Sequence, residues 1–187
     1  MSWKQTLKDE LQGAKKESTA SGPGTAAVLV LIGRRPGRDT EEILLTKRTQ
    51  LVETHKGQIS FPGGFWTAGD EGSLQTALRE CEEEVGLIER DIEVIGALPL
   101  VRTRGAVPIF PWVARTDFPT ELLVNEGEVD RVLYLPLDQL VREGLQPVTV
   151  EARDYKVQSI GIKVGNELVW GATARVLQHL CAHLKKP

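Results

Sequence analysis

The apolar residues of this chain fall into short runs whose spacing predicts a β-rich core. Residues 26–32 are continuously apolar, which is typical of a strand that is buried on both faces and central in its sheet. Residues 43–47 form its expected partner, and the polar stretch 33–42 between them predicts a surface connection. Residues 156–164 alternate like a half-exposed strand and precede a turn at Gly165-Asn166. Further strands are expected at 92–101, 106–114 and 129–135.

Other segments carry apolar residues at the spacing of an amphipathic helix. Residues 2–16 place Trp3, Leu7 and Leu11 on one helical face. Two more helices are expected, at 137–142 and at about 173–184. Strands interleaved with helices predict an α/β (α+β) fold, in which a mixed β-sheet lies between helices in an α/β/α sandwich.

Length and composition fit one globular domain. The chain has 187 residues, of which 41% are hydrophobic, and this is enough for a substantial core. Residues 1–25 are expected to form an N-terminal helix and a linker, and residues 26–187 the domain itself. Within that domain, Pro108 and Pro111 predict that the strand at 106–114 is an edge or bulged strand, because proline cannot donate to a sheet ladder.

The segment between Ser73 and Gly86 predicts a helix with one apolar and one acidic face. Ser73 is the expected N-cap, and Gly86 is the expected left-handed residue after the helix. Glu80, Glu83 and Glu84 fall within one arc of about 100° around the helix axis. The residues of a second, apolar arc are Leu74, Ala77, Leu78, Cys81 and Val85.

The three carboxylates of the acidic arc predict a metal site. Like charges at i, i+4 repel each other, and the C-terminal end of a helix is already negative. A hard divalent cation removes this penalty, and oxygen ligands alone favour Mg²⁺ or Mn²⁺ over zinc, which prefers thiolate or imidazole clusters. The alternative is a solvated acidic helix end. Glu82 lies on a different arc, about 160° from Glu80, and is expected to be solvated.

This segment matches the pattern G-x5-E-x7-R-E-U-x-E-E-x-G-U, in which U is aliphatic, and the chain therefore resembles the Nudix hydrolases. Gly64 lies one residue further upstream than the pattern requires, and Cys81 replaces an aliphatic residue. The extra residue falls in the turn-like stretch 65–70, where an insertion is sterically easy. The matching positions are Glu71, Arg79, Glu80, Glu83, Glu84, Gly86 and Leu87.

The chain is similar, more narrowly, to the coenzyme A pyrophosphatase branch of the Nudix family. The similarity lies in the segments 44–48, 57–64, 125–129 and 169–174, and the same one-residue extension occurs in that branch. Thr49 stands where the branch usually has Ser or Ala, and Glu53 stands where it has Arg. A glutamate at position 53 would repel a phosphate that arginine binds, so Glu53 bears on the choice of substrate more than on the reaction.

The resemblance implies roles for the charged residues. Glu80, Glu83 and Glu84 would bind the metal and act in catalysis, and Arg79 would orient Glu83, which lies four residues further on. Related enzymes draw a base or an extra ligand from a downstream loop. Glu128 and Glu126 are the candidates for this role, with ordinary surface charge as the alternative. Glu71 is either an acid at the start of the helix or a participant in the metal site.

A second group of residues is expected to contact the substrate. Gly63 and Gly64 would let the backbone pass close to metal and phosphate, where a Cβ would obstruct. His55 is interpreted as a loop histidine, and Trp170 as core packing in preference to a shelf for adenine. The residues expected to hold phosphates are Arg48, Lys47 and Arg104, with Arg102 as a further candidate, and each could equally be a surface charge.

The resemblance implies Mg²⁺- or Mn²⁺-dependent hydrolysis of a nucleoside diphosphate linkage. The expected substrate is coenzyme A or acyl-CoA, which would give 3′,5′-ADP and (acyl-)4′-phosphopantetheine. One alternative keeps the chemistry and changes the substrate to a nucleotide sugar, ADP-ribose, NADH or a dinucleotide. Another is a Nudix module that binds a nucleotide without cleaving it. An isomerase on the same fold would need additional Cys or His catalysts.

Charge and cysteine usage limit the partners. The formal net charge of −3 provides no basic field for nucleic acid or an anionic membrane surface, so an anionic substrate must be met locally. Cys81 and Cys181 are expected to be buried free thiols. No apolar run reaches the length of a signal or membrane segment, which predicts a cytoplasmic protein. The N-terminal helix could serve a homodimer as well as a monomer.

Overall fold

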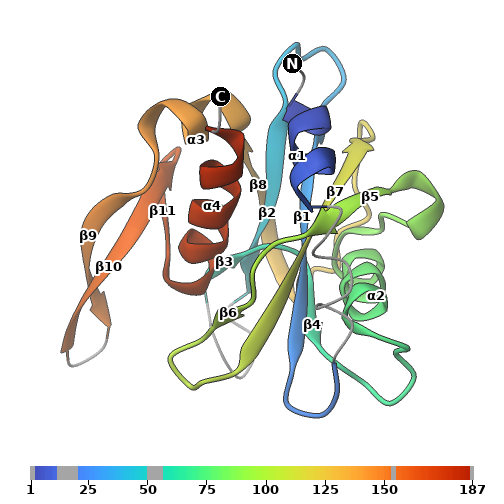
Figure 1. The fold of residues 1–187 in the computed structure, drawn as a ribbon, viewed down its shortest axis with the longest axis horizontal. Helices are drawn as coiled ribbons and strands as arrows, with labels where there is room; N and C mark the ends of the chain where they lie inside the picture. Colours follow the sequence, from blue (N-terminus) through green and yellow to red (C-terminus); the bar gives the residue numbers. More distant parts are fainter. Residues whose placement is uncertain (1–2, 12–20, 50–56, 153–154, 186–187) are drawn as a thin grey trace.

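The fold is built on an eight-stranded mixed sheet with β1 (Ala26–Arg34) near its centre. The computed structural model describes residues 3–11, 21–49, 57–152 and 155–185 (Figure 1). The sheet path runs β3-β2-β1-β7-β5, and β4, β6 and β8 pair with β1, β7 and β2 respectively. The other strands are β2 (Glu42–Arg48), β3 (Ile59–Ser60), β4 (Gly63–Phe65), β5 (Glu93–Ala97), β6 (Val101–Arg102), β7 (Pro108–Asp117) and β8 (Val129–Pro136).

Helices cover both faces of this sheet, which confirms the predicted α/β sandwich. Figure 1 shows α2 (Ser73–Val85) on one side of the central strands and α1 (Trp3–Leu11) and α4 (Gly171–Leu184) on the other. Successive residues of β1 alternate between two cores. Leu29 and Leu31 belong to the cluster under α2, and Val30 and Ile32 to the cluster under α1 and α4. The continuous apolar run is thus explained by burial on both sides.

The N-terminal helix is part of the main core. Leu7 and Leu11 are fully buried and lie in the same cluster as Val30 and Leu177. A Cβ at Gly96 of β5 would lie 2.5 Å from the Cβ of Leu11, so the helix packs directly on the strand. Residues 12–16 of the predicted helix lie outside the described residues. The boundary drawn at residue 25 stays a prediction.

A second sheet of three strands flanks α4. It has the order β11-β10-β9, with β9 (Gln146–Ala152), β10 (Tyr155–Val164) and β11 (Glu167–Trp170). The hairpin of β9 and β10 extends away from the main sheet (Figure 1). The prediction of a strand at 156–164 is confirmed, as is the following turn, whereas β9 and β11 were not predicted. The short helix α3 (Leu137–Glu143) follows β8 as expected.

The prediction that Pro108 and Pro111 mark an edge or bulged strand is wrong. Strand β7 pairs with β1 in parallel along nine residues and with β5 and β6 on its other side. Pro108 is its first residue, where a missing donor matters least. The Pro111 carbonyl accepts a bond from the Leu98 N–H, so the Pro111 nitrogen faces the break between β5 and β6, where no ladder bond is lost.

Of two smaller predictions, one differs from the structure and one is confirmed. The strand expected at 92–101 is divided into β5 and β6, because the chain leaves the ladder after Ala97. Cys81 and Cys181 are buried free thiols, as expected. Among the helices of the described residues, none has the length and apolar character needed to cross a bilayer.

Candidate active site

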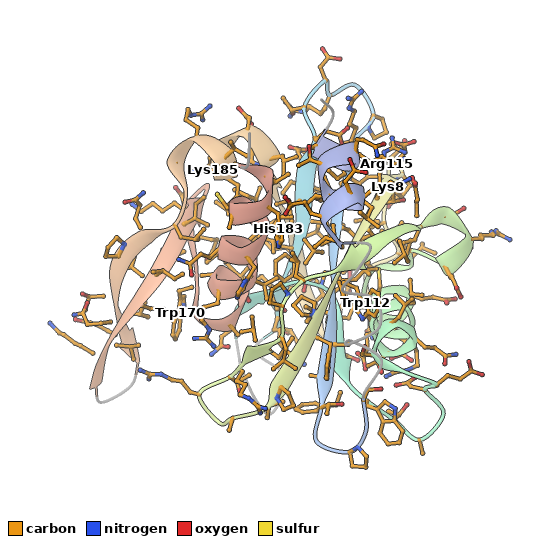
Figure 2. All side chains as sticks on the ribbon, viewed as in Figure 1. Lys8, Trp112, Arg115, Trp170, His183 and Lys185 are labelled. Atoms are coloured by element: carbon orange, nitrogen blue, oxygen red, sulfur yellow. The ribbon has the colours of Figure 1, made fainter. Side chains whose placement is uncertain are left out.

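Helix α2 carries the acidic arc, and its local structure follows from its sequence. The apolar arc is buried against the sheet, and Cys81 and Val85 have no exposed surface. Gly86 adopts the expected left-handed conformation, with φ 74°, and its N–H donates to the Glu82 carbonyl. The expectation for Ser73 is wrong: the N-cap is Gly72, and the Ser73 hydroxyl accepts a bond from the Trp112 indole N–H. Figure 2 shows Trp112 beside α2.

Glu84 is the most buried carboxylate of the arc. Only 2% of its side chain is exposed, and it lies 3.5 Å from both the Arg48 guanidinium and the Thr46 hydroxyl. Burial raises the pKa of Glu84 to about 8, against the opposing effects of Arg48 and of the Gly63 N–H, which donates to its carboxylate. The charges of Glu80 and Glu128 raise it further. A buried carboxyl group whose negative charge is this poorly compensated is a strong candidate for a cation ligand.

Glu80 and Glu83 both face Arg79. The Arg79 guanidinium lies 2.9 Å from Glu80 and 3.0 Å from Glu83. Glu80 is largely buried and its pKa is raised, mainly by desolvation, whereas the side chain of Glu83 is 52% exposed. The predicted orienting contact between Arg79 and Glu83 is therefore present. Glu82 is exposed, as expected for a residue on another arc.

The glycines of β4 pass directly over these carboxylates. A Cβ added at Gly64 would lie 2.4 to 2.5 Å from the carboxylate atoms of Glu80. A Cβ at Gly63 would instead meet the backbone of β1, 2.3 Å from the Ala27 carbonyl oxygen. Both glycines are thus required by close approach, one to the sheet and one to the acidic arc.

Asp70 is a site residue that the sequence analysis did not single out. Its buried carboxylate accepts bonds from Arg79 Nε and Nη2 (3.0 and 3.2 Å), and from the Thr67 N–H and the Thr76 hydroxyl. Glu71 was selected because the pattern E-x7-R, counted back from Arg79, ends at this residue. The structure shows that Glu71 is exposed. Counting forward from Gly64 would have found Asp70, because G-x5-E measured from Gly64 ends at this residue.

A cavity of about 470 Å³ opens beside the acidic arc. Arg48, Glu80 and Glu128 are the charged residues among the described residues that line it. Much of the remaining wall is apolar and comes from β1, β7, the end of β11 and the start of α4, including Val28, Ile109, Trp170, Ala172 and Val176.

Of the predicted cations, Arg48 lines the cavity formed by the described residues, whereas Lys47, Arg104 and Arg102 do not. Trp170 is half-buried and lines the cavity at the junction of β11 and α4 (Figure 2), so it is not simply core packing. Lys47 forms an ion pair with Glu167, at 2.6 Å, and Arg104 is exposed; neither lines the cavity formed by the described residues. Arg102 is exposed and bonds the Ala106 carbonyl. Glu53 and His55 lie outside the described residues.

The donor chemistry of the acidic arc fits Mg²⁺ or Mn²⁺. All its donors are carboxylate oxygens, and desolvation and the charges of neighbouring carboxylates disfavour the ionised forms of Glu80 and Glu84. In the described part of the chain, no three His, Cys, Asp or Glu side chains stand in position to hold one ion. Arg79 Nη1 contacts one carboxylate oxygen of Glu80 and one of Glu83. The second oxygen of each carboxylate would be available to a cation while Arg79 holds the first.

Comparison with known proteins decides the family. A family model described as the NUDIX domain matches residues 23–157. The chain belongs to the Nudix family. It is 34% identical over 162 residues to a Klebsiella pneumoniae protein named uncharacterized Nudix hydrolase NudL, and 31% identical over 160 residues to its Pectobacterium atrosepticum namesake. Each match covers 85% of this chain and 82% of the relative.

Solved structures support the Nudix fold. A MutT/nudix family protein from Enterococcus faecalis has a TM-score of 0.57 and 18% identity, covering 86% of this chain and 61% of that one. A C. elegans Ap4A hydrolase has a TM-score of 0.52 and 19% identity, covering 63% and 84%. The protein is thus a Nudix hydrolase, a family whose members generally use divalent metals such as Mg²⁺ or Mn²⁺.

Replacing Asp70 by asparagine should destabilise the Nudix helix and its entry loop. The change leaves Arg79 without its buried anionic partner, and we expect a loss of about 2–3 kcal/mol in the free energy of unfolding at pH 7. Arg79 lowers the pKa of Asp70 to about 2. The stabilisation is therefore complete above an unfolded-state pKa of about 3.9 and disappears as the pH falls toward 2.

Urea unfolding of the wild type and the variant between pH 7 and pH 2 measures this effect. The difference between the two proteins should shrink below about pH 4. Glu71→Gln is the matched control, since Glu71 is the exposed neighbouring acid, and it should change stability by less than about 0.5 kcal/mol. An equal loss in both variants would contradict the assignment of Asp70.

Proposed function

We propose that this Nudix hydrolase cleaves the diphosphate linkage of coenzyme A or acyl-CoA, giving 3′,5′-ADP and (acyl-)4′-phosphopantetheine. The observation that carries the proposal is the lining of the cavity, which combines three charged residues with a largely apolar wall. The charged residues Glu80, Glu128 and Arg48 suit a diphosphate with its cation. The apolar wall suits a neutral arm such as pantetheine, which carries amides and methyl groups but no charge.

Sequence similarity supports the same substrate. The segments 44–48 and 57–64, which resemble the coenzyme A branch, include Arg48, Gly63 and Gly64, and these three residues line the cavity. The retained carboxylates Glu80, Glu83 and Glu84 argue against a module that binds without cleaving.

Each residue has a task in the hydrolysis. Glu80, Glu83 and Glu84 would hold Mg²⁺ or Mn²⁺, which neutralises the phosphate oxygens and lowers the pKa of the attacking water. Glu128 would accept a proton from that water. The oxygen of the water would then bond to one phosphorus while the bridging P–O bond breaks. Arg48 would bind a phosphate oxygen of the substrate, because its guanidinium lines the cavity beside Glu84.

A substrate panel tests the proposal. With Mg²⁺ or Mn²⁺ present, we expect kcat/KM for coenzyme A and its short acyl thioesters to exceed that for ADP-ribose, NADH and UDP-glucose by about tenfold or more. Chromatography should show 3′,5′-ADP as a product, and EDTA should abolish its formation. Preferred cleavage of another panel member would overturn the coenzyme A assignment but leave the metal site. No turnover of any diphosphate would overturn the enzymatic proposal.

A further inference from the structure

Asn125 joins α2, which carries the buried Glu84, to the loop that carries Glu128 of the cavity. It lies in the loop between β7 and β8, three residues before Glu128. Its main-chain N–H donates to the carbonyl of Glu84 at 3.0 Å. Glu84 therefore anchors this loop through its backbone carbonyl, and its side chain is the most buried acid of the arc.

The side chain of Asn125 reaches the other carboxylate. Its amide NH₂ donates to the Glu128 carboxylate at 3.4 Å, and its amide oxygen accepts the Gly127 N–H at 3.1 Å. Its main-chain carbonyl accepts the N–H groups of Glu128 and Val129, at 3.0 and 2.9 Å. Asn125 thus holds both the backbone and the carboxylate of Glu128.

A second anchor fixes the opposite side of Glu128. The Thr49 N–H donates to the Glu128 carbonyl at 2.9 Å, directly after Arg48, which lines the same cavity. The charge of Glu128 contributes to the raised pKa values of Glu80 and Glu84, so its carboxylate lies within electrostatic range of both. Because the Glu128 backbone is held from two sides, the Asn125 side chain can set the direction of the carboxylate.

We propose that Asn125 is a positioning residue, which aims the Glu128 carboxylate at the acidic arc of α2 so that Glu128 can take the proton of the attacking water. This inference rests on the proposed function. The two ends of the Asn125 amide have separate tasks. The amide oxygen closes the turn at Gly127, and the NH₂ group contacts Glu128.

Two substitutions separate these tasks. Asn125→Ala removes both contacts. Asn125→Asp keeps an oxygen for the Gly127 N–H but has no donor for Glu128 and adds a like charge beside it. If Asn125 positions Glu128, both variants should lower kcat about tenfold or more, with KM for coenzyme A changed less than about threefold. If Asn125 only closes the turn, Asn125→Asp should retain the wild-type kcat, because its oxygen can still accept the Gly127 N–H.

A double-mutant cycle tests whether the effect passes through Glu128. In a Glu128→Ala background, Asn125→Ala should change kcat less than about twofold, because its target is gone. Glu121→Gln is the control for the loop, since Glu121 is exposed and lies outside the cavity-lining residues, and it should retain wild-type kcat. Additive losses in the double variant would overturn the proposal.

Crystal structures of the variants give a readout that needs no activity. In Asn125→Ala and Asn125→Asp, the Glu128 carboxylate should move by about 1 Å or more away from Glu80 and Glu84, a displacement large enough to impair catalysis. A carboxylate that stays in place would overturn the proposal. If the wild type hydrolyses no diphosphate, the proposed function fails, and the position of Glu128 in these structures still decides the role of Asn125.

Discussion

Glu84→Gln should lower metal-dependent kcat/KM by about 10³-fold or more. Glutamine keeps the shape of the side chain and can still lie beside Arg48 and Thr46, but it removes the negative charge that a divalent cation requires. Because Glu84 is almost fully buried, water cannot replace the lost ligand charge easily. Steady-state kinetics across a range of Mg²⁺ concentrations measures the loss, and excess Mg²⁺ should not restore activity.

The same variant should be more stable than the wild type when metal is absent. The folded-state pKa of Glu84 is raised to about 8, well above the unfolded value of about 4.3. The folded state therefore retains a proton that the unfolded state loses, and wild-type stability falls as the pH rises from about 4 to about 8. Glutamine does not titrate, so at pH 8 the free energy of unfolding of the variant should exceed that of the wild type by on the order of a few kcal/mol.

Thermal unfolding at pH 5 and pH 8, with EDTA or with Mg²⁺, measures this difference in stability between the variant and the wild type. Mg²⁺ should stabilise the wild type and leave Glu84→Gln unchanged, because ligands stabilise only the state that binds them. Glu82→Gln is the matched control on the same helix, since Glu82 is exposed, and it should behave as the wild type does. A Glu84→Gln protein that kept both turnover and metal stabilisation would contradict the metal site.

The parts of the fold predicted from sequence are those determined by local patterns. The apolar run of β1 predicted a central strand because both faces of β1 are buried, and the apolar arc of α2 predicted the face that packs on the sheet. Gly86 was predicted correctly because a left-handed residue after a helix favours glycine whatever its tertiary surroundings.

The features that the sequence did not predict depend on contacts distant along the chain. Pro111 is tolerated in a central strand only because its nitrogen faces the break after Ala97. Ser73 does not cap α2, and its hydroxyl binds Trp112, a residue of β7. Strand β11 pairs through only four residues, which is too short for a periodic pattern.

In the candidate site, too, local patterns could be predicted and distant contacts could not. The spacing of Glu80, Glu83 and Glu84 could be read directly from the helix period, and the structure places all three on α2. The surroundings of Glu84 could not be predicted, because Arg48 approaches α2 from β2. The partner of Lys47 is equally non-local, since Glu167 lies on β11.

Gly64→Ala should reduce activity about 10²-fold while leaving the protein almost as stable as the wild type. The backbone of Gly64 is not in the left-handed region, so alanine causes no backbone strain there. The new Cβ would lie 2.4 to 2.5 Å from the carboxylate of Glu80, which can swing aside at little cost in stability. The displaced carboxylate can then no longer reach its position as a metal ligand.

The pairing of an intact fold with an impaired site distinguishes this effect from general destabilisation. Gly69→Ala is the matched control, because Gly69 lies in the loop that follows β4 and a Cβ there meets no atom within 4 Å. Thermal unfolding should give similar midpoints for both variants, whereas Mn²⁺ titration by calorimetry should show weaker binding for Gly64→Ala alone. Unchanged Mn²⁺ affinity and turnover in Gly64→Ala would mean that metal binding does not depend on the Glu80 carboxylate, which would contradict the assignment of Glu80 as a metal ligand.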